Sequence, residues 1–480
     1  MTGLVYANVA AAHGRNVVVL EQHTKVGGYA SNFKRKRQYI FDCSLHKITG
    51  LGENGNLADA LERAGLLELI DFHLYENLTT FIIGGRVIKL PADGRKFFQC
   101  LSREFPDQST ALEKLSSDIR SHGYQNYMLA RLALGEYQID PSLIIGSKAL
   151  SKITAFEYFR SIFDNDDLIT LFCALSVNLG VEAYEADALY FLHFAYTFLF
   201  TDKGYIKGSS QTLSDILAAE LERRGGTILV REPVTKLKVA GNKLTGCQTK
   251  RYDISAKHIV FTACPHQIAE LLPEQCHSTG FFEKLDKLEF GLGAFIVYLG
   301  LDAPPHECGL TVSDYLVGDT DYLHNAEVAL NTDTRYDCWP LSISNYHELD
   351  PDYGYVVQLE ILDHKSDWFD LDRDAYRKKK KHMALRIIDR ACKNFPALKD
   401  HIKYMDISTP RTNYKFTGSG GGSAFGYKPV PGRNTRFLQT PPVAGLQFVG
   451  TWVNGAGYEP AMCLGFTTAT LRNRLHTPEN

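Results

Sequence analysis

Residues 1–30 of the chain read MTGLVYANVAAAHGRNVVVLEQHTKVGGYA. The apolar, alanine-rich stretch at residues 4–14 predicts a buried helix, and the β-branched stretch at residues 16–20 predicts a strand. The strand ends on an acidic residue, Glu21, and a pair of glycines follows it. A helix, a strand and a terminal acid in this order are typical of the second half of a dinucleotide-binding βαβ unit.

The glycines and the acid of this stretch each suit one part of a dinucleotide. Gly3 fits the last glycine of the tight turn before the helix, where backbone N–H groups face a pyrophosphate. Glu21 follows at a spacing from which an acid accepts hydrogen bonds from ribose hydroxyls. Gly27 and Gly28 allow a second backbone segment to approach the phosphates. The alternative, an arbitrary helix before a core strand, leaves this glycine pair unexplained.

Composition places the chain among ordinary globular proteins. Its 480 residues give room for two or three domains, with 44% hydrophobic and 22% charged side chains. The net charge of −3 gives no electrostatic reason to expect a nucleic-acid partner. The ten cysteines show neither CxxC nor zinc-type spacing, so we expect no metal site and a cytoplasmic location. No stretch reaches the ~18 uncharged apolar residues of a spanning helix, which leaves peripheral membrane contact open.

Three regions of the chain share the character of one nucleotide-binding domain. They are residues 1–75, 201–289 and 411–480, which combine helices with short strands and glycine turns. The intervening residues, 76–200 and 290–410, are of different character, and we assign them to a substrate-binding domain. We therefore expect an α/β fold in which a Rossmann-like, three-layer domain is discontinuous in sequence and contains an inserted α+β domain.

Two further stretches extend the pattern: FDCSLHKITG at residues 41–50 and GLQFVGTWVNGAGYEPAM at residues 445–462. With the N-terminal stretch and the central strands, they resemble the phytoene desaturase family of flavoproteins, which includes carotenoid isomerases and retinol saturases. Members usually carry FDxGxH after the glycine pair, and this chain matches that motif except that Ser44 replaces the glycine. The resemblance implies FAD as the cofactor of the Rossmann-like domain.

The resemblance also implies further contacts with FAD. Val234, in the central strands, would present its backbone to the adenine. The C-terminal strand, turn and helix start would hold the pyrophosphate, the ribityl chain and the flavin, through Gly450, Thr451, Gly457, Ala461 and Met462. The N-terminus of that last helix would offer positive potential to the N1 edge of a reduced flavin.

In the resembled family, a strand and two more glycines precede the position of Gly3. Met1 then corresponds to the methionine inside a GxGMTG turn, so ~20 residues of the pattern have no counterpart in this sequence. We expect the central strand of the Rossmann sheet to be missing here, and FAD binding to be weakened for that reason.

Two residues are candidates for catalysis. His46 ends the FDCSLH motif and is expected near the flavin or the substrate, with a backbone-satisfied histidine as an equal alternative. Glu459 is placed close to the flavin ring by the layout of the resembled family, where a carboxylate can serve as a general acid or base. The alternative for Glu459 is that it caps the final helix just before Pro460.

The expected activity is FAD-dependent oxidoreduction at carbon–carbon bonds of an apolar, isoprenoid- or polyene-like substrate. Desaturation, saturation and isomerisation all remain open, because the same cofactor serves each of them. A flavin amine oxidase shares the scaffold and is one alternative, although we find no cage for an amine in the sequence. A truncated, inactive homologue is the other alternative.

Aromatic and aliphatic residues are concentrated at residues 150–200, in FEYFRSIF, LITLFCAL and YFLHFAYTFLF. We expect them to line an apolar site whose rim touches a membrane, since a polyene must enter from a lipid phase. The alternative is that these stretches are ordinary core. His193, inside the last stretch, is expected to be a buried, hydrogen-bonded residue rather than a catalyst.

Overall fold

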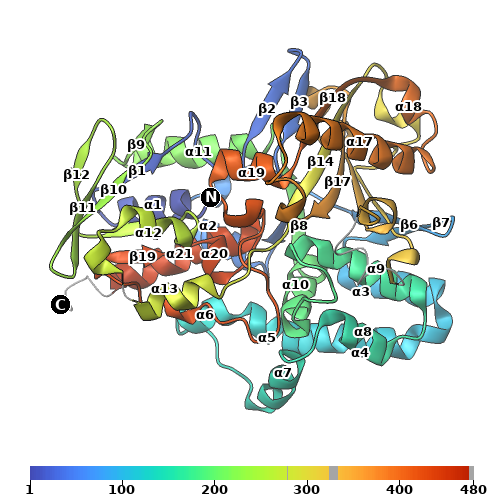
Figure 1. The fold of residues 1–480 in the computed structure, drawn as a ribbon. Coiled ribbons are helices and arrows are strands. Elements are labelled where there is room, and N and C mark those ends of the chain that lie inside the picture. Colours follow the sequence, from blue (N-terminus) through green and yellow to red (C-terminus); the bar gives the residue numbers. More distant parts are fainter. Residues whose placement is uncertain (278, 324–332, 475–480) are drawn as a thin grey trace.

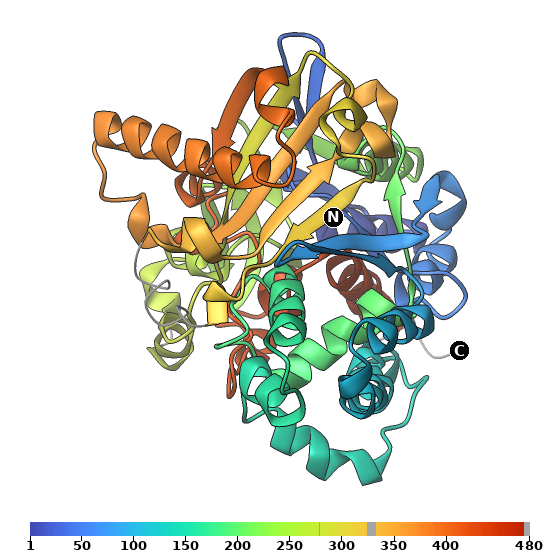
Figure 2. The same cartoon turned by 90° about the vertical axis from the view of Figure 1, so that its right-hand side faces the viewer.

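The computed structural model describes residues 1–277, 279–323 and 333–474, and Figure 1 shows their arrangement. Helices and short strands from both ends and the middle of the chain gather on the left and in the centre of that view, and we call them the nucleotide part. A large sheet with a group of helices forms the right, and we call it the sheet part. Figure 2 shows the sheet lying above these helices.

Two pairs of parallel strands lie at the centre of the nucleotide part. β1 (Val18–Glu21) pairs with β9 (Thr227–Val230), and β13 (Ile259–Phe261) pairs with β19 (Leu446–Phe448). Each pair joins segments that are far apart in the sequence, with helix α1 (Thr2–Ala12) packed against β1. Parallel pairing of this kind, with helices on the strands, is the pattern of an α/β fold.

Helix α1 is buried along most of its length because other helices enclose it. Helix α21 (Tyr458–Arg474) passes so close that a Cβ on Gly465 would lie 2.6 Å from the carbonyl oxygen of Thr2. Helices α2 (Asn56–Arg63) and α11 (Ser210–Arg223) pack against α21 and α1 respectively. The absence of a side chain at Gly465 therefore lets the start of α1 pack directly against the middle of α21.

Smaller antiparallel sheets complete the nucleotide part. They are the hairpin of β2 (Asn32–Arg35) and β3 (Tyr39–Asp42), the sheet of β4 (Ile48–Leu51), β8 (Asp202–Ile206) and β5 (Phe72–Leu74), and the sheet of β10 (Lys236–Ala240), β11 (Lys243–Gln248) and β12 (Asp253–Ser255). Its short helices are α12 (Ile268–Leu271), α13 (Thr279–Asp286), α19 (Pro410–Thr417) and α20 (Thr451–Asn454).

A seven-stranded sheet dominates the sheet part, in the order β18-β14-β17-β16-β15-β6-β7. The strands are β18 (Ile402–Ser408), β14 (Gly293–Leu301), β17 (Val356–Asp363), β16 (Leu341–Asn345), β15 (Asp314–Val317), β6 (Asn77–Ile83) and β7 (Arg86–Pro91). Neighbours run antiparallel except β15 and β6. All seven strands come from residues 76–200 and 290–410, the ranges assigned above to a substrate domain; that division into domains stays a prediction.

The two faces of this sheet have different partners. Helix α17 (Arg373–Cys392) covers one face, where Ile387 packs with Phe295 of β14 in a single apolar core. Ile296 and Tyr298, the alternate residues of β14, pack instead with the core of the nucleotide part. The period of two along a strand therefore gives each face its own core.

The helices beside the sheet begin at recognisable caps. Thr154, Asn165 and Asp187 each accept a hydrogen bond from the backbone at the start of a helix. The helices of this group are α3 (Gly94–Glu104), α4 (Ser109–Asp118), α5 (Tyr124–Tyr127), α6 (Leu129–Ala133), α7 (Ile144–Leu150), α8 (Ala155–Ile162), α9 (Asp166–Leu175) and α10 (Ala188–Phe200). In the parts of the chain that the structure describes, none of the helices is long and apolar enough to cross a membrane.

Candidate functional site

A cavity of about 2400 Å³ lies between the nucleotide part and the sheet part. Residues 15–33 and 254–264, which include β1 and β13, line it on one side. Strands of the seven-stranded sheet and helix α10 line it on the other side. Typical ligand pockets have volumes of roughly 300–1,000 Å³, so this cavity has room for a large cofactor together with a substrate.

Two helices begin at the wall of this cavity. Thr2 and Gly3 at the start of α1 line it, and so do Tyr458 and Ala461 at the start of α21. The first N–H groups of a helix have no partner inside the helix, and the helix dipole adds positive potential there. The cavity is therefore suited to a negatively charged group such as a pyrophosphate.

Glycines shape the backbone around these helix starts. Gly27 has a φ of +117° and lies so close to Ser214 and Ala30 that a Cβ would overlap the Ser214 Oγ and the Ala30 carbonyl oxygen. Gly457 has a φ of +115° directly before α21. Side chains other than hydrogen rarely adopt these conformations, so the turns at the cavity wall require glycine.

Glu21 and Val234, the residues expected to contact the adenosine, both line the cavity. Glu21 is the last residue of β1, lines the cavity and accepts a hydrogen bond from the backbone N–H of His23 at 2.8 Å. Val234 lines the same cavity in the segment after β9. The cavity therefore offers a carboxylate for the ribose hydroxyls of FAD, a backbone segment for its adenine and two helix N-termini for its pyrophosphate.

The structure brings most of the predicted cofactor residues to the cavity wall: Gly3, Glu21, Gly27, Gly28, Val234, Thr451, Gly457 and Ala461. Gly450 lies behind this wall, where a Cβ would be 3.2 Å from Thr2 Oγ1, so its small size lets α1 approach. Met462 is fully buried in the core beside α1. These two residues lie outside the cavity lining, and their predicted contact with the cofactor stays a prediction.

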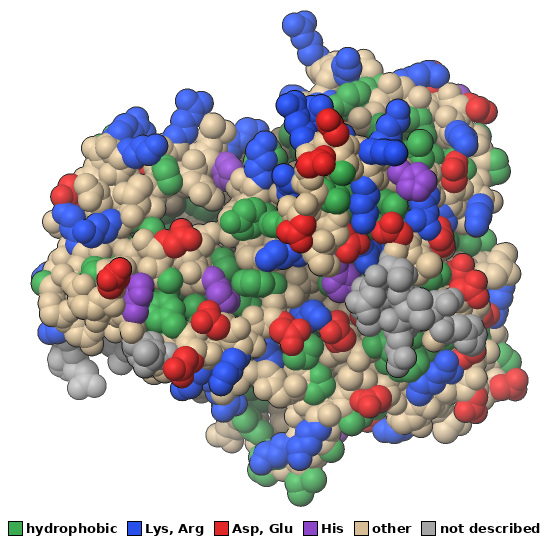
Figure 3. Space-filling model, in the orientation of Figure 1, with side chains coloured by type: hydrophobic (Ala, Val, Ile, Leu, Met, Phe, Trp, Pro, Cys, Tyr) green, Lys and Arg blue, Asp and Glu red, His purple; other side chains and the backbone are tan. Residues whose placement is uncertain are grey.

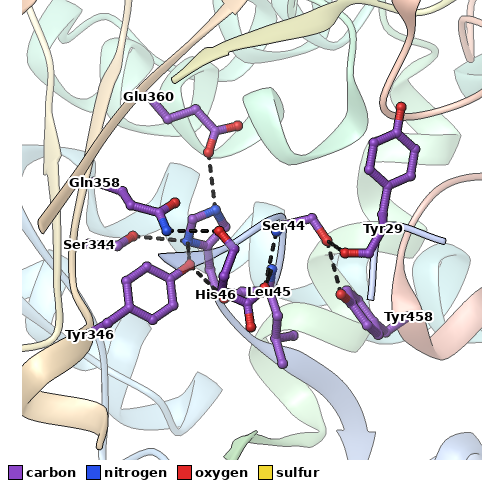
Figure 4. Close-up of polar contacts among 10 residues, drawn as sticks. Tyr29, Ser44, Leu45, His46, Ser344, Tyr346, Gln358, Glu360 and Tyr458 are labelled. Carbon is purple, nitrogen blue, oxygen red and sulfur yellow. Dashed lines mark hydrogen bonds and ion pairs between the residues drawn. The ribbon is translucent and has the colours of Figure 1, made fainter. Parts of the chain in front are cut away.

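The FDCSLH motif folds into a turn that its own aspartate holds. The buried carboxylate of Asp42 accepts hydrogen bonds from the backbone N–H groups of Ser44 at 3.1 Å and Leu45 at 2.9 Å. Ser44, in the glycine position of the motif, uses its hydroxyl to donate to the carbonyl of Tyr29 at 2.9 Å and to contact the hydroxyl of Tyr458 (Figure 4). The serine thus ties the motif to the start of α21.

This turn points His46 at the seven-stranded sheet (Figure 4). His46 Nε2 lies 3.1 Å from a carboxylate oxygen of Glu360 on β17. His46 Nδ1 lies 2.9 Å from Ser344 Oγ and 3.2 Å from the hydroxyl of Tyr346. Burial would lower the pKa of His46, but the hydrogen bond and charge of Glu360 outweigh it and raise that pKa above its ordinary value. Both ring nitrogens are therefore used to join the two parts of the molecule.

Glu360 has a second carboxylate oxygen that is not hydrogen-bonded to any described residue. It lines the cavity, and its side chain is 17% exposed. Among the described residues, His46 is the one hydrogen-bond partner of this carboxylate. In the register of the sheet, Glu360 lies opposite Ser342, which also lines the cavity. The sheet thus presents polar side chains to the same cavity that the aromatic face of α10 lines.

Glu459 lies behind the cavity wall rather than in it. Its side chain is 3% exposed and is not part of the cavity lining. One carboxylate oxygen accepts hydrogen bonds from the hydroxyls of Thr49, at 2.6 Å, and Thr197. Burial raises the pKa of Glu459, while these hydroxyls lower it by a smaller amount. These bonds tie α21 to β4 and α10, and they replace the helix cap that the sequence suggested as an alternative.

Helix α10 divides the aromatic stretch between the cavity and the core. One of its faces lines the cavity with Tyr190, His193, Phe194, Thr197 and Phe198. The opposite face is packed in the core around the sheet. Burial lowers the pKa of His193 to about 4, so its imidazole is neutral near pH 7, and it lies 3.1 Å from the side-chain nitrogen of Asn126. Within α10, one face therefore lines the cavity and the other face belongs to the core, as the two alternatives from the sequence suggested.

Sequence reasoning missed the polar residues that the sheet contributes. Glu360 and Asp314 line the cavity from β17 and β15, and Lys47, the residue after His46, pairs with Asp314. A glutamate inside the largely apolar stretch GYVVQLEIL was the available signal for Glu360. Its partner, however, lies more than three hundred residues away in the chain.

The fold and the cavity define a dinucleotide-dependent oxidoreductase. The chain belongs to the family described as flavin containing amine oxidoreductase, which matches residues 1–460. It is an FAD-dependent enzyme, and the expected Rossmann-like α/β fold and FAD cofactor are confirmed. The expected relationship to retinol-acting and carotenoid-acting flavoproteins is confirmed as well.

Two of the similar curated proteins come from Danio rerio. The all-trans-retinol 13,14-reductase is 22% identical and aligns over 88% of this chain and 76% of its own length. The inactive all-trans-retinol 13,14-reductase is 25% identical and aligns over 98% of this chain and 83% of its own length. The chloroplastic prolycopene isomerase of Daucus carota is 23% identical, over 94% of this chain and 73% of its own length.

Solved structures with the same fold include amine oxidases. Putrescine oxidase bound to putrescine superposes with a TM-score of 0.64 at 14% identity, covering 98% of this chain and 96% of that one. An oxidoreductase from Methanosarcina mazei gives a TM-score of 0.63 at 14% identity, covering 98% of both chains. At this identity the likeness concerns the fold alone.

Proposed function

We propose that the protein adds hydrogen across a carbon–carbon double bond of an apolar, isoprenoid-like substrate, or removes hydrogen from a single bond to form one. The observation that supports this most strongly is the single cavity that joins the glycine-lined helix starts to the aromatic face of α10. The similar proteins named for retinol and prolycopene act on polyenes, which such a wall suits. The same cavity would hold the reactive ring of FAD next to the substrate.

Changing a C–C single bond into a double bond removes one hydride and one proton, and the reverse reaction adds both. FAD, when bound, supplies the hydride chemistry. The chain must supply the group that takes or gives the proton. Glu360 suits this role because it lines the cavity and only one of its carboxylate oxygens is bonded to a described residue, His46. His46 acts as a positioning residue, because both of its ring nitrogens already contact protein groups.

Glu459 takes a positioning role in this scheme. Its carboxylate is enclosed by Thr49 and Thr197 behind the wall, so it holds the start of α21 rather than reaching a substrate. The amine oxidase alternative would use Glu360 differently, as an anion that pairs with a substrate ammonium. These two uses of one carboxylate can be separated by experiment.

The test compares Glu360→Gln with the parent protein, supplied with FAD and a polyene of the retinoid or carotenoid class. We expect kcat to fall by about a hundredfold or more, with a smaller change in KM, because proton transfer contributes on the order of 10²–10⁴ in rate. Glu113→Gln on the exposed surface of α4 is the matched control. Turnover of polyenes by Glu360→Gln at the parent rate would contradict the assignment, and turnover of amines alone would favour the alternative.

We also propose that the protein takes its substrate from a membrane surface, which it contacts through α7. This helix and the turn before it project from the lower edge of the molecule, where Figure 3 shows hydrophobic and basic side chains together. Ile145 is 82% exposed, and Lys148 and Lys152 are exposed beside it. No acidic residue occurs at residues 141–156, so the tip suits an anionic lipid surface.

This location differs from the rim expected at residues 150–200. LITLFCAL, in α9, is fully buried, so that stretch contributes to the core and not to a rim. Helix α7 instead packs against α10, whose other face lines the cavity. An exposed apolar tip and the apolar wall of the cavity thus share one supporting helix.

Co-sedimentation with liposomes that contain anionic lipid tests this contact. We expect Ile145→Glu, alone or with Lys148→Glu, to reduce the bound fraction severalfold, since each replaces an attraction with a repulsion. Val87→Glu is the matched control, because Val87 is 62% exposed on β7, at the far side of the sheet. Equal sedimentation of Ile145→Glu and the parent protein would contradict the role of α7.

A further inference from the structure

Lys47 and Asp314 form a buried ion pair in the cavity wall that the chemistry above does not use. Lys47 Nζ lies 2.8 Å from Asp314 Oδ2, and the two side chains are only 9% and 8% exposed. Lys47 follows His46 in the nucleotide part, whereas Asp314 begins β15 of the sheet. Both residues line the cavity. The pair therefore spans the two parts of the molecule at the edge of the substrate space.

The pair retains hydrogen-bonding capacity. An ammonium group has three N–H donors, and among the described residues Asp314 is the one acceptor of Lys47. The Tyr75 ring lies 5.1 Å from Lys47 Nζ and limits the side on which a further ligand can approach. Asp314 accepts an additional hydrogen bond from Ser313 Oγ at 2.8 Å. A small polar group in the cavity could therefore join the pair without breaking it.

The surroundings of the pair are polar along one line of the sheet. Asp314 lies opposite Ser344 on β16, and Ser342, two residues earlier, lies opposite Glu360 on β17. This line of polar residues therefore leads from the Lys47–Asp314 pair to the carboxylate proposed to move the proton. A chain that lies along it would have one end at the pair and an interior bond near Glu360.

We propose that Lys47 and Asp314 bind a hydroxyl group at the end of an otherwise apolar substrate. A hydroxyl can accept a hydrogen bond from Lys47 and donate one to Asp314, so both charges stay satisfied. A carboxylate end would pair with Lys47 but be repelled by Asp314, and an ammonium end would pair with Asp314 but be repelled by Lys47. A hydrocarbon end would leave the remaining donors of Lys47 without an acceptor.

This inference rests on the proposed function, and it narrows the substrate from any polyene to an alcohol of that class. The competing explanation is that the pair only fastens the two parts of the molecule together. If the pair only joins the two parts of the molecule, removing it should lower the stability of the fold without changing the order in which different ligands bind. A binding role would change the preference among ligands that differ only in their end group.

The experiment uses four ligands with one polyene chain, ending in a methyl, a hydroxyl, a carboxylate or an amine. Binding to the FAD-supplied protein is followed by quenching of tryptophan fluorescence, and KM and kcat are measured for each ligand that is turned over. We expect the alcohol to bind at least about tenfold more tightly than the hydrocarbon, because a site built for a hydroxyl discriminates against its absence. The carboxylate and the amine should both bind more weakly than the alcohol.

The key variant is Lys47→Met/Asp314→Leu, which removes both charges and leaves neither one buried alone. We expect it to lose the preference for the alcohol, with KM for the alcohol rising about tenfold and kcat changing less. A conservative second variant, Asp314→Asn, removes one charge but keeps the shape and an acceptor oxygen, and it should lose part of the preference.

The matched control is Lys399→Met, which breaks a Lys–Asp ion pair of the same 2.8 Å length on the exposed surface. It should leave the order of the four ligands unchanged. An alcohol preference that survives in the double variant would overturn the inference, and so would tightest binding of the amine or the carboxylate in the parent protein. Failure of all four ligands to bind would overturn the proposed function itself.

Discussion

The two sides of the cavity are built in different ways. On the nucleotide side, the geometry lies in the backbone: helix starts at Thr2 and Tyr458, and glycines with positive φ such as Gly27. On the sheet side, the geometry lies in side chains that meet across long distances in the sequence, as His46 and Glu360 do. Backbone turns tolerate few substitutions, whereas side-chain contacts can be exchanged one at a time. The nucleotide side should therefore respond to mutation with large losses, and the sheet side with graded ones.

The largest expected loss is at Gly27. A Cβ there would overlap Ser214 Oγ and the Ala30 carbonyl oxygen, and the φ of +117° is strained for any other residue. We expect Gly27→Val to destabilise the fold by about 3 kcal/mol or more and to abolish retention of FAD. Thermal unfolding and the flavin absorbance of the purified protein measure both effects.

The control for this prediction is Gly280→Ala in helix α13. A Cβ on Gly280 meets no atom within 4 Å, and its φ is not positive. This change should leave stability nearly unaltered. A Gly27→Val protein with the parent melting temperature and flavin content would show that the turn is not rigid and would remove the main contrast between the two sides.

A smaller loss is expected at Glu21, which acts through its side chain although it lies on the nucleotide side. Glu21→Ala should weaken FAD binding by about 1.5–3 kcal/mol, because charge-assisted hydrogen bonds to ribose hydroxyls are lost. Titration with FAD measures the affinity, and Glu222→Ala on the exposed surface of α11 is the matched control. Unchanged affinity in Glu21→Ala would make Glu21 an ordinary strand-end residue.

This difference between the two sides of the cavity also explains which residues could be predicted from the sequence. Gly3, Glu21 and the glycine pair after it follow each other within one local unit, so their spacing alone indicated a dinucleotide and the α/β fold. The C-terminal stretch indicated the start of α21 in the same way, since Gly457 directly precedes that helix. Residues whose role depends on backbone conformation leave a local signal in the sequence.

The sheet side left no such signal. Glu360 meets His46 only because β17 pairs with β14 and β16 in one particular register, and a shift by one residue would turn Glu360 to the opposite face. The role expected for Glu459 came from its place in the motif, but the depth at which Thr197 encloses it depends on how α10 packs. The aromatic composition of residues 150–200 indicated an apolar region, but it could not show which side chains face the cavity.

The smallest predicted effect tests whether the sheet side depends on a charge. The pKa of His46 lies above its ordinary value of 6.5, because the hydrogen bond and charge of Glu360 outweigh the effect of burial. A raised pKa in the folded state means that protonation favours folding. The stabilisation is therefore fully present below pH 6.5 and is lost as the pH rises through the folded-state pKa.

Replacing His46 with glutamine removes the charge but keeps a hydrogen-bonding side chain. We expect the parent protein to exceed His46→Gln in unfolding free energy by about 1 kcal/mol at pH 5.5, and the difference to shrink as the pH rises toward 8.5. Urea unfolding across this range measures the difference. If the difference in unfolding free energy between the parent protein and His46→Gln does not change with pH, neutral hydrogen bonds of His46 join the two parts of the molecule. The sheet side would then resemble the nucleotide side, where shape rather than charge sets the geometry.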